Sequence, residues 1–248
     1  MKAFLLAAGK GKRLLPFTEE LPKPLYKVLG KPLIQWNIEK LRDAGFSQIV
    51  INVHHLADKL VDVIGDGSKF DLEISYSFER ELLGTGGGVG NALDLIGDDP
   101  FVLLSGDLWT NYNFQSLELA PNSLAHMVLV SNLGKDEGDV FLNQGRLNIH
   151  GKGEKYTFSR IAVLDPKLFT KIKKKNYQLW ESVLLPACEE NLITGELYMG
   201  DLFNINSLEE AERLDAFLTR ELTARPLGQI HGKEREHNSP IHTVRRLC

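Results

Sequence analysis

Short apolar runs alternate with amphipathic stretches over residues 1–107 of this 248-residue chain, and few folds are compatible with that order. The expected strands are 3–8, 48–53, 72–76 and 101–104, and the expected helices are 32–44, 56–64 and 88–96. Such alternation is typical of α/β proteins whose strands run parallel. We therefore predict an α/β fold: a single open mixed sheet, mainly parallel, with helices on both faces.

The second half of the sequence is less regular. Strands are expected at 124–131 and 156–164, a hairpin of 140–142 and 146–149 turning through 143–145, and helices at 181–191 and 207–218. The last residues mix Pro, Gly, His and charge with little periodicity. We expect one domain over 1–224 and a loosely attached tail over 225–248.

Charge and composition exclude several classes of protein. The formal net charge is −4, whereas nucleic-acid-binding proteins usually carry a basic surplus. The first apolar run is too short for a signal peptide, and no run of about 18 apolar residues follows. The chain has two cysteines, which fits a reducing compartment. We expect a cytoplasmic protein, a monomer or small homo-oligomer, that binds neither nucleic acid nor membrane.

In open α/β sheets, ligands bind beyond the carboxyl ends of the strands. The loops after Ala7, Tyr76 and Leu104 are therefore expected to converge on one crevice. The first of them reads Gly-Lys-Gly-Lys-Arg at 9–13, with Pro-Lys-Pro-Leu at 22–25. Backbone N–H groups of such a turn and the nearby cations suit a polyphosphate. Leu14 excludes the Gly-x-Gly-x-x-Gly fingerprint, and no Gly-Lys-Ser/Thr follows; a flexible surface loop is the alternative.

Two later segments carry further candidates. Leu-Gly-Thr-Gly-Gly-Gly at 83–88 precedes a predicted helix, where glycines would let the chain lie against a planar base; tight helix packing is the alternative. Asp107 follows a buried strand, where a carboxylate can hold a hard divalent cation; a solvated turn residue is the alternative.

Together, the glycine loop, Pro-Lys-Pro-Leu, Leu-Gly-Thr-Gly-Gly and Ser-Gly-Asp resemble the sugar-1-phosphate nucleotidylyltransferases over residues 1–220. This resemblance implies a glycosyltransferase-A-like, Rossmann-like nucleotidyltransferase fold and Mg²⁺ as cofactor. Within the family, residues 81–88, 106–112, 138–139 and 156–159 most resemble the enzymes of peptidoglycan recycling that use UTP and N-acetylmuramate α-1-phosphate. The family usually has Gly after the segment matching 158–159, whereas this chain has Arg160.

The resemblance also implies roles for individual residues. Arg13 and Lys23 would be catalytic, and Asp107 and Asn204 would hold the metal, with Asp201 as a rival for the second ligand. Nucleotide contacts would come from Ala8, Gly9, Gly11, Lys12, Arg13, Lys23, Gly84, Thr85 and Gly86. Sugar contacts would come from Ser105, Trp109, Asp139 and Glu196. A core or rim aromatic is the alternative for Trp109, and a surface carboxylate is the alternative for Asp139 and Glu196.

The implied reaction joins a nucleoside triphosphate and a sugar 1-phosphate to give a nucleotide-diphospho-sugar and pyrophosphate. Alternative substrate pairs are mannose 1-phosphate with GTP and glucose 1-phosphate with UTP or dTTP. A non-catalytic nucleotide-sugar-binding regulatory subunit is an alternative of a different class. Such subunits tend to lose the Arg and Lys of the loop, whereas Arg13, Lys23 and Asp107 are present here.

Overall fold

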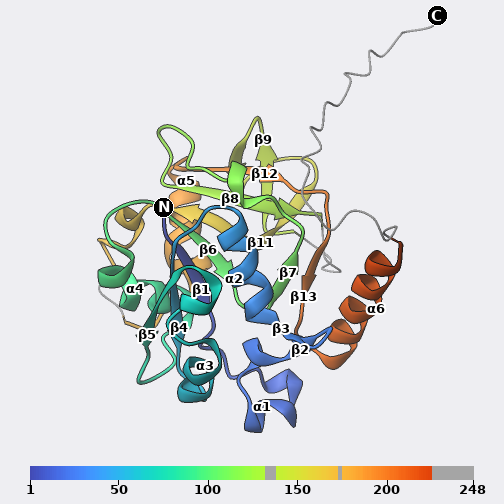
Figure 1. Ribbon diagram of the computed structural model, residues 1–248. Coiled ribbons are helices and arrows are strands. Elements are labelled where there is room, and N and C mark those ends of the chain that lie inside the picture. The colour runs from blue at the N-terminus through green and yellow to red at the C-terminus, as the bar shows by residue number, and fades with distance from the viewer. Residues whose placement is uncertain (132–137, 173–174, 225–248) are drawn as a thin grey trace, which may run out of the picture.

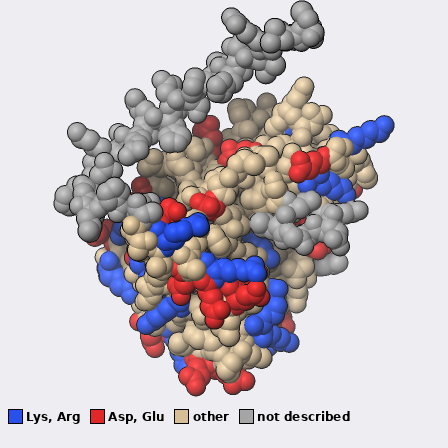
Figure 2. Space-filling model, turned by 90° about the vertical axis from the view of Figure 1, so that its right-hand side faces the viewer, with Lys and Arg blue, Asp and Glu red and all other residues tan. Residues whose placement is uncertain are grey.

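A computed structural model describes residues 1–131, 138–172 and 175–224 (Figure 1). The predicted tail at 225–248 lies outside the described residues. Among the residues described, no helix is long and apolar enough to cross a membrane. Acidic and basic side chains are intermixed on the face of the molecule that carries the last helix (Figure 2).

The first half of the chain forms the parallel sheet that the sequence predicts. Its strands lie in the order β5-β4-β1-β6, all parallel: β5 (Glu73–Phe78), β4 (Gln48–Val53), β1 (Ala3–Leu6) and β6 (Phe101–Ser105). The crossover helices are α2 (Leu33–Asp43), α3 (Ala57–Ile64) and α4 (Gly84–Ile96). Because parallel strands end at one edge, their carboxyl ends bring the three predicted loops together.

The second half corrects the prediction of an open, mainly parallel sheet. β11 (Lys155–Leu164) pairs antiparallel with β6, and β8 (Ala125–Val130), β12 (Ile193–Leu197), β10 (Arg146–Asn148) and β9 (Val140–Asn143) follow in that order. β9 then pairs with β11, so five strands close into a ring at the top of Figure 1.

The ring closes because β11 changes partner along one edge. Its last residues, from Ile161, pair with β6, whereas Lys155 and Tyr156 pair with β9. The register against β8 shifts between Phe158 and Ile161, which marks a β-bulge. Bulges bend a strand and increase its local twist. This bend allows β11 to pair with the open sheet at one end and with the ring at the other.

Side-chain alternation along the central strands divides the core between the two faces of the sheet. On β1, Leu5 faces the cluster that includes α2 and α3, and Phe4 faces the cluster that includes α4. Helices thus cover both faces, as predicted. A third cluster lies under α6 (Leu208–Ala224), where Leu214 and Leu218 pack against Trp109.

Several short elements lay outside the sequence prediction. The most important are β7 (Leu108–Thr110) and β13 (Leu202–Asn204), which pair antiparallel. Others are α1 (Phe17–Glu20), β2 (Lys27–Val28) and β3 (Lys31–Pro32). α5 (Leu185–Glu189) lies within the helix predicted at 181–191 and follows a π-helix over Trp180–Leu184. The predicted β9–β10 hairpin is confirmed; it turns through Gln144 and Gly145, both with positive φ, as type I′ turns require.

Candidate active site

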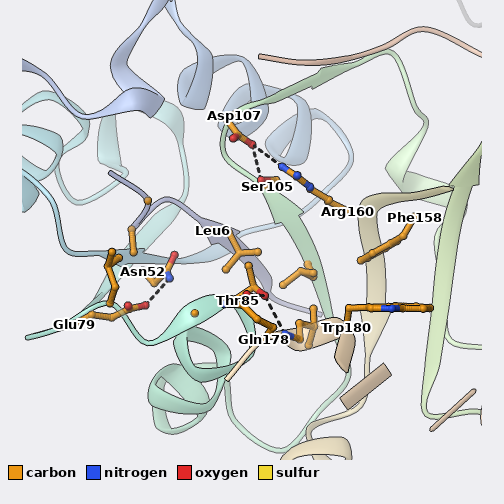
Figure 3. A pocket seen from close by; sticks show the side chains of 16 residues that line it. Leu6, Asn52, Glu79, Thr85, Ser105, Asp107, Phe158, Arg160, Gln178 and Trp180 are labelled. Atoms are coloured by element: carbon orange, nitrogen blue, oxygen red, sulfur yellow. Dashed lines mark hydrogen bonds and ion pairs between the residues drawn. The ribbon is translucent and has the colours of Figure 1, made fainter. Parts of the chain in front are cut away.

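A cavity of about 390 Å³ opens at the carboxyl ends of the parallel strands (Figure 3). The three loops expected to converge all contribute to it: Ala8 and Gly9 after β1, Glu79 after β5, and Ser105 and Asp107 at and after β6. Its other lining residues are Leu6, Asn52, Leu82, Gly84, Thr85, Leu103, Phe158, Arg160, Gln178, Leu179 and Trp180. The predicted crevice is therefore confirmed.

Asp107 lies at the rim of this cavity with a positive charge near each carboxylate oxygen. Lys23 Nζ forms an ion pair with Oδ2, and Arg160 Nη1 lies 3.9 Å from Oδ1. Ser105 Oγ donates a hydrogen bond to Oδ1 over 2.6 Å. Burial on its own would raise the pKa of Asp107, but Lys23, with help from Ser105 and Arg160, holds that pKa below its ordinary value. Asp107 is therefore a carboxylate at neutral pH.

Asn204 lies beside Asp107 because β13 pairs with β7. Asn204 is the partner of Leu108 in this ladder, and the next residue, Ile205, donates its backbone N–H to Asp107 O over 3.0 Å. The rival carboxylate, Asp201, instead accepts a hydrogen bond from Asn111 Nδ2 over 2.8 Å, and it lines neither the cavity of Figure 3 nor its neighbour. This geometry favours Asn204 over Asp201 as the second metal ligand.

The Asp107–Asn204 pair fits a magnesium ion in its donor chemistry. Carboxylate and amide oxygens are hard ligands, and Mg²⁺ needs only one or two carboxylates when a substrate supplies phosphates. No group of three or more His, Cys, Asp or Glu side chains that could hold a metal occurs among the described residues. A metal at this pair would therefore depend on the nucleotide for part of its coordination.

The glycine loop is folded against Lys23. Gly11 has a φ of 60°, and a Cβ there would come within 2.9 Å of Lys23 Cβ and Thr18 Cγ2. Thr18 Oγ1 also donates to Gly11 O over 3.1 Å. Gly11 thus allows the loop to pack tightly enough to direct Lys23, which is about nine-tenths buried, toward Asp107.

Arg13 and Lys12, two of the cations of the glycine loop, differ in their placement. Arg13 donates through Nη2 to Asn206 Oδ1 over 2.8 Å, and Lys23 Nζ lies 3.2 Å from the same oxygen. Asn206 therefore holds Arg13 and Lys23 together, a role with no signal in the sequence beyond its closeness to Asn204. Lys12 is exposed and lines neither cavity.

The second glycine segment forms the first turns of α4, which begins at Gly84 and not at Gly88 as predicted. Gly84 and Thr85 line the cavity, and Thr85 Oγ1 donates to Gln178 Oε1 over 3.2 Å. Gly86 does not line it, because a Cβ there would lie 2.5 Å from the Tyr177 ring. The glycines of this turn therefore serve helix packing as well as the cavity wall.

Asn52 and Glu79 form a buried polar pair at the far end of the cavity (Figure 3), and the sequence prediction missed both. Asn52 Nδ2 donates to Glu79 Oε1 over 2.6 Å, and Asn52 Oδ1 accepts from Ala7 N over 2.7 Å. Leu83 N donates to Glu79 Oε2 over 3.1 Å. The pair presents a fixed set of acceptors and donors beside Ala8 and Gly9, suited to the polar edge of a base.

The candidate sugar contacts are only partly supported by the geometry. Ser105 lines the cavity, but Trp109 is 7% exposed and packs against Phe203 and Phe217 in the core. Trp109 is therefore not placed to contact a sugar, because β7 turns its ring under α6. Aromatic walls come instead from Phe158 and Trp180.

Asp139 and Glu196 also lie away from the cavity. Asp139 Oδ2 accepts a hydrogen bond from Phe158 N over 2.9 Å. It therefore stabilises β11 at Phe158, which lines the cavity. Glu196 is exposed and accepts a hydrogen bond from the Tyr112 hydroxyl. Burial and this carboxylate raise the pKa of Tyr112 well above its ordinary value. Neither carboxylate lines the cavity, so these two predicted sugar contacts gain no support.

A second cavity of about 460 Å³ lies on the other side of Arg160. Arg13, Arg160 and Arg213 contribute to it, and Glu210 is its one acidic residue. The remaining lining residues are Thr157, Phe158, Ser159, Leu202, Phe203, Asn204 and Asn206. Arg160, together with Phe158, is shared by the two cavities, which flank the Asp107–Asn204 pair.

Lys40 contacts Thr110 and Trp109 of β7, and its partly buried ammonium makes the stability of the protein depend on pH. Its ammonium donates to Thr110 O and lies 5.0 Å from the Trp109 ring centroid, and burial lowers its pKa from 10.5 to about 8. Between these values the unfolded chain binds more protons, so the free energy of unfolding rises with pH. Lys40→Met should abolish this contribution. Urea unfolding at pH 7–10 should show wild type gaining stability relative to Lys40→Met above pH 8, and parallel profiles would contradict the assignment.

Comparison with known proteins agrees with this geometry. Residues 2–136 match the nucleotidyl transferase family. N-acetylmuramate alpha-1-phosphate uridylyltransferase of Neisseria meningitidis serogroup B is 37% identical over 86% of this chain and 98% of its own length. UTP–glucose-1-phosphate uridylyltransferase of Synechocystis sp. is 32% identical over 80% of this chain and 54% of its own length.

Solved structures share the fold at lower identity. HddC of Yersinia pseudotuberculosis complexed with GMP-PN has a TM-score of 0.74 at 20% identity, covering 88% of this chain and 99% of that one. UDP-glucose pyrophosphorylase complexed with UDP-glucose has a TM-score of 0.71 at 19% identity, covering 89% and 98%. The family match and the full-length relative show that the chain belongs to the sugar-1-phosphate nucleotidyltransferases.

Proposed function

We propose that this enzyme transfers a uridylyl group from UTP to N-acetylmuramate α-1-phosphate, giving UDP-N-acetylmuramate and pyrophosphate. The observation that carries the chemistry is Asp107 at the cavity rim, paired with Lys23 and flanked by Asn204. The choice of substrates is supported by 37% identity to the Neisseria enzyme over nearly the whole of that protein. A role in peptidoglycan recycling would follow from the same substrates.

The proposed reaction needs no general base. A phosphate monoester has its second pKa near 6, so the attacking phosphate is already a dianion at neutral pH. The main obstacle is the approach of two anions, and charge neutralisation and positioning provide most of the catalysis in such transfers. Turnover should therefore fall below about pH 6 as the acceptor is protonated. This acid limb should persist unchanged in His54→Ala and His55→Ala variants.

Each cation of the site would neutralise a different phosphate group of the substrates. Lys23 would neutralise the α-phosphate, and Arg13, held by Asn206, would bind the departing pyrophosphate with help from Lys12 and the N–H groups of the glycine loop. Mg²⁺ on Asp107 and Asn204 would supply a further positive charge to the reacting phosphates.

We propose that Glu79 and Asn52 recognise the base of the nucleotide. Glu79→Gln keeps the shape but replaces one acceptor oxygen by an NH₂ group, so either Leu83 N or Asn52 Nδ2 loses its partner. We expect the KM for UTP to rise by about tenfold, the worth of one buried hydrogen bond, with a smaller change in the KM for the sugar. Steady-state kinetics against both substrates test this prediction. Glu81→Gln, an exposed neighbour, is the matched control.

The proposal as a whole is tested by pyrophosphate release with Mg²⁺. Four nucleoside triphosphates would be combined with N-acetylmuramate, N-acetylglucosamine, glucose and mannose 1-phosphates. Release confined to UTP with N-acetylmuramate 1-phosphate is the expected result. Release with mannose and GTP, or glucose and UTP or dTTP, would retain the chemistry but replace the substrates. Nucleotide binding without release from any pair would indicate a regulatory subunit.

A further inference from the structure

Arg160 has a backbone conformation that is unusual for its position. Its φ is 68°, in the left-handed region that favours glycine. The other described non-glycine residues with positive φ lie in turns or at helix ends, whereas Arg160 lies inside β11, at the bulge between Phe158 and Ile161. Strained residues persist where the surrounding structure imposes them, and they cluster at ligand sites.

The side chain of Arg160 points toward Asp107, one member of the pair that would hold the metal (Figure 3). Nη1 lies 3.9 Å from Asp107 Oδ1 and 3.4 Å from Asn204 Oδ1. The side chain is 46% exposed. A guanidinium has five N–H donors, and this long contact to Asn204 is its one hydrogen bond among the described residues. Arg160 therefore has donors to offer to a ligand.

The surroundings of Arg160 favour an anion. Of the four charged residues that line the second cavity, three are arginines. The carboxylate of Glu210 accepts hydrogen bonds from Asn206 N and Ser207 N at the start of α6, so it does not neutralise Arg160. A phosphate, which matches the planar donors of arginine, is a suitable occupant beside this side chain.

Asp107 separates two cations that come from different parts of the fold. Lys23 approaches Oδ2 from the N-terminal loop, where Arg13 also lies, and Arg160 approaches Oδ1 from β11. In the proposed reaction the leaving pyrophosphate is held by the loop cations, so the attacking phosphate needs a cation from the other side. Among the described residues, Arg160 is the arginine that lines both cavities, whereas Arg13 and Arg213 line only the second.

We propose that Arg160 binds the phosphate of the sugar 1-phosphate and holds it beside Asp107 for attack. This inference rests on the proposed function. A phosphate oxygen of the sugar forms the new bond to the α-phosphorus, the bond from that phosphorus to the β-phosphate oxygen breaks, and pyrophosphate leaves with the electron pair. No proton transfer is needed. Arg160 supplies charge and position on the acceptor side.

Two variants separate the charge of Arg160 from its backbone strain. Arg160→Gly removes both, and Arg160→Gln removes the charge but keeps a side chain in the left-handed conformation. We expect both to raise the KM of the sugar 1-phosphate at least about tenfold, as expected for a hydrogen bond to a charged group, with the KM of UTP within about twofold of wild type. Arg160→Lys should restore part of the loss.

Stability and acceptor affinity measured together distinguish a ligand-binding arginine from a merely structural one. Arg160→Gly should raise Tm while weakening the binding of the sugar 1-phosphate. Arg160→Gln should weaken that binding without raising Tm. Gln144→Gly is the matched control, since it relieves a positive φ of 48° at an exposed hairpin turn away from both cavities. It should raise Tm without changing either KM. Calorimetric titration of the sugar 1-phosphate, with a non-hydrolysable UTP analogue present, should reproduce the KM changes as changes in Kd.

Four results would overturn the proposal in distinguishable ways. If wild type turns over and Arg160→Gly leaves the acceptor KM unchanged, this inference fails and the proposed function stands. If the UTP KM rises instead, Arg160 serves the nucleotide. If binding weakens for N-acetylmuramate 1-phosphate but not for N-acetylglucosamine 1-phosphate, Arg160 binds the sugar carboxylate. Absence of wild-type turnover with every sugar would remove the proposed function and this inference together.

Discussion

Asp107→Asn is expected to lower kcat by at least about 10²–10³-fold, the usual cost of losing one transition-state electrostatic contact. The substitution is isosteric but removes the charge that lies between Lys23 and Arg160. It would also weaken the proposed metal pair, so the Mg²⁺ concentration for half-maximal turnover should rise. Turnover should be measured over a Mg²⁺ titration, because added metal would recover part of an affinity defect but not a defect in chemistry.

Asp201→Asn is the matched control for this variant. Asp201 is also near Asn204 in sequence, but its carboxylate accepts from Asn111 and lines neither cavity. It should retain turnover within a few-fold of wild type. Asp107→Asn leaves the buried ammonium of Lys23 without its ion pair, so thermal unfolding must show that the variant is folded. Near-normal turnover in Asp107→Asn, with loss of turnover in Asp201→Asn, would contradict the assignment of Asp107 as the metal carboxylate.

Gly87→Ala should destabilise the protein, although it adds only one methyl group to α4. In an open helix, Gly to Ala usually stabilises by up to about 1 kcal/mol. Here a Cβ would lie 2.2 Å from Lys175 O, a backbone atom that cannot rotate away. Overpacking of this kind costs about 1–3 kcal/mol, or occasionally more. We expect a lower free energy of unfolding in urea and a higher KM for UTP, because α4 also carries Gly84 and Thr85.

Gly90→Ala tests whether the backbone contact is the cause. It lies in the same helix, but its Cβ would meet the Tyr177 hydroxyl at 2.5 Å, the far end of a side chain that can shift. It should therefore cost less than Gly87→Ala. Equal or reversed costs would show that helix propensity, and not the approach of Lys175, controls stability in this turn.

The parallel half of the fold could be predicted because each strand has a legible pattern. β1 and most of β6 are continuous apolar runs, β4 is rich in β-branched residues, and β5 alternates apolar and polar side chains. The closed ring could not be predicted, since it depends on β11 pairing with β6 at one end and with β9 at the other. That change of partner occurs at the bulge beside Arg160, where the resemblance implied only that the family usually has a glycine. The start of α4 was missed for a related reason. The glycines at 84–88 favour a loop in the sequence, and only the structure shows that Tyr177 packs against them.

The candidate site was predicted where a motif or resemblance marked it and missed where single residues act together. Asp107 and Lys23 lie in recognisable segments, and the structure pairs them. Asn52 and Glu79 are isolated polar residues at strand ends, so nothing in the sequence shows that they meet. For Trp109 the sequence left both a sugar contact and a core position open, because the motif is the same in either case, and the structure places the ring in the core.

The central claim is that a phosphate oxygen of the sugar attacks the α-phosphate of the nucleotide and releases pyrophosphate. The most direct test uses N-acetylmuramate 1-phosphate labelled with ¹⁸O in its phosphate, with UTP and Mg²⁺, and mass analysis of both products. We predict that the nucleotide-diphospho-sugar retains all of the label and that pyrophosphate carries none. Label in pyrophosphate, or nucleotide consumption without a labelled nucleotide sugar, would contradict it.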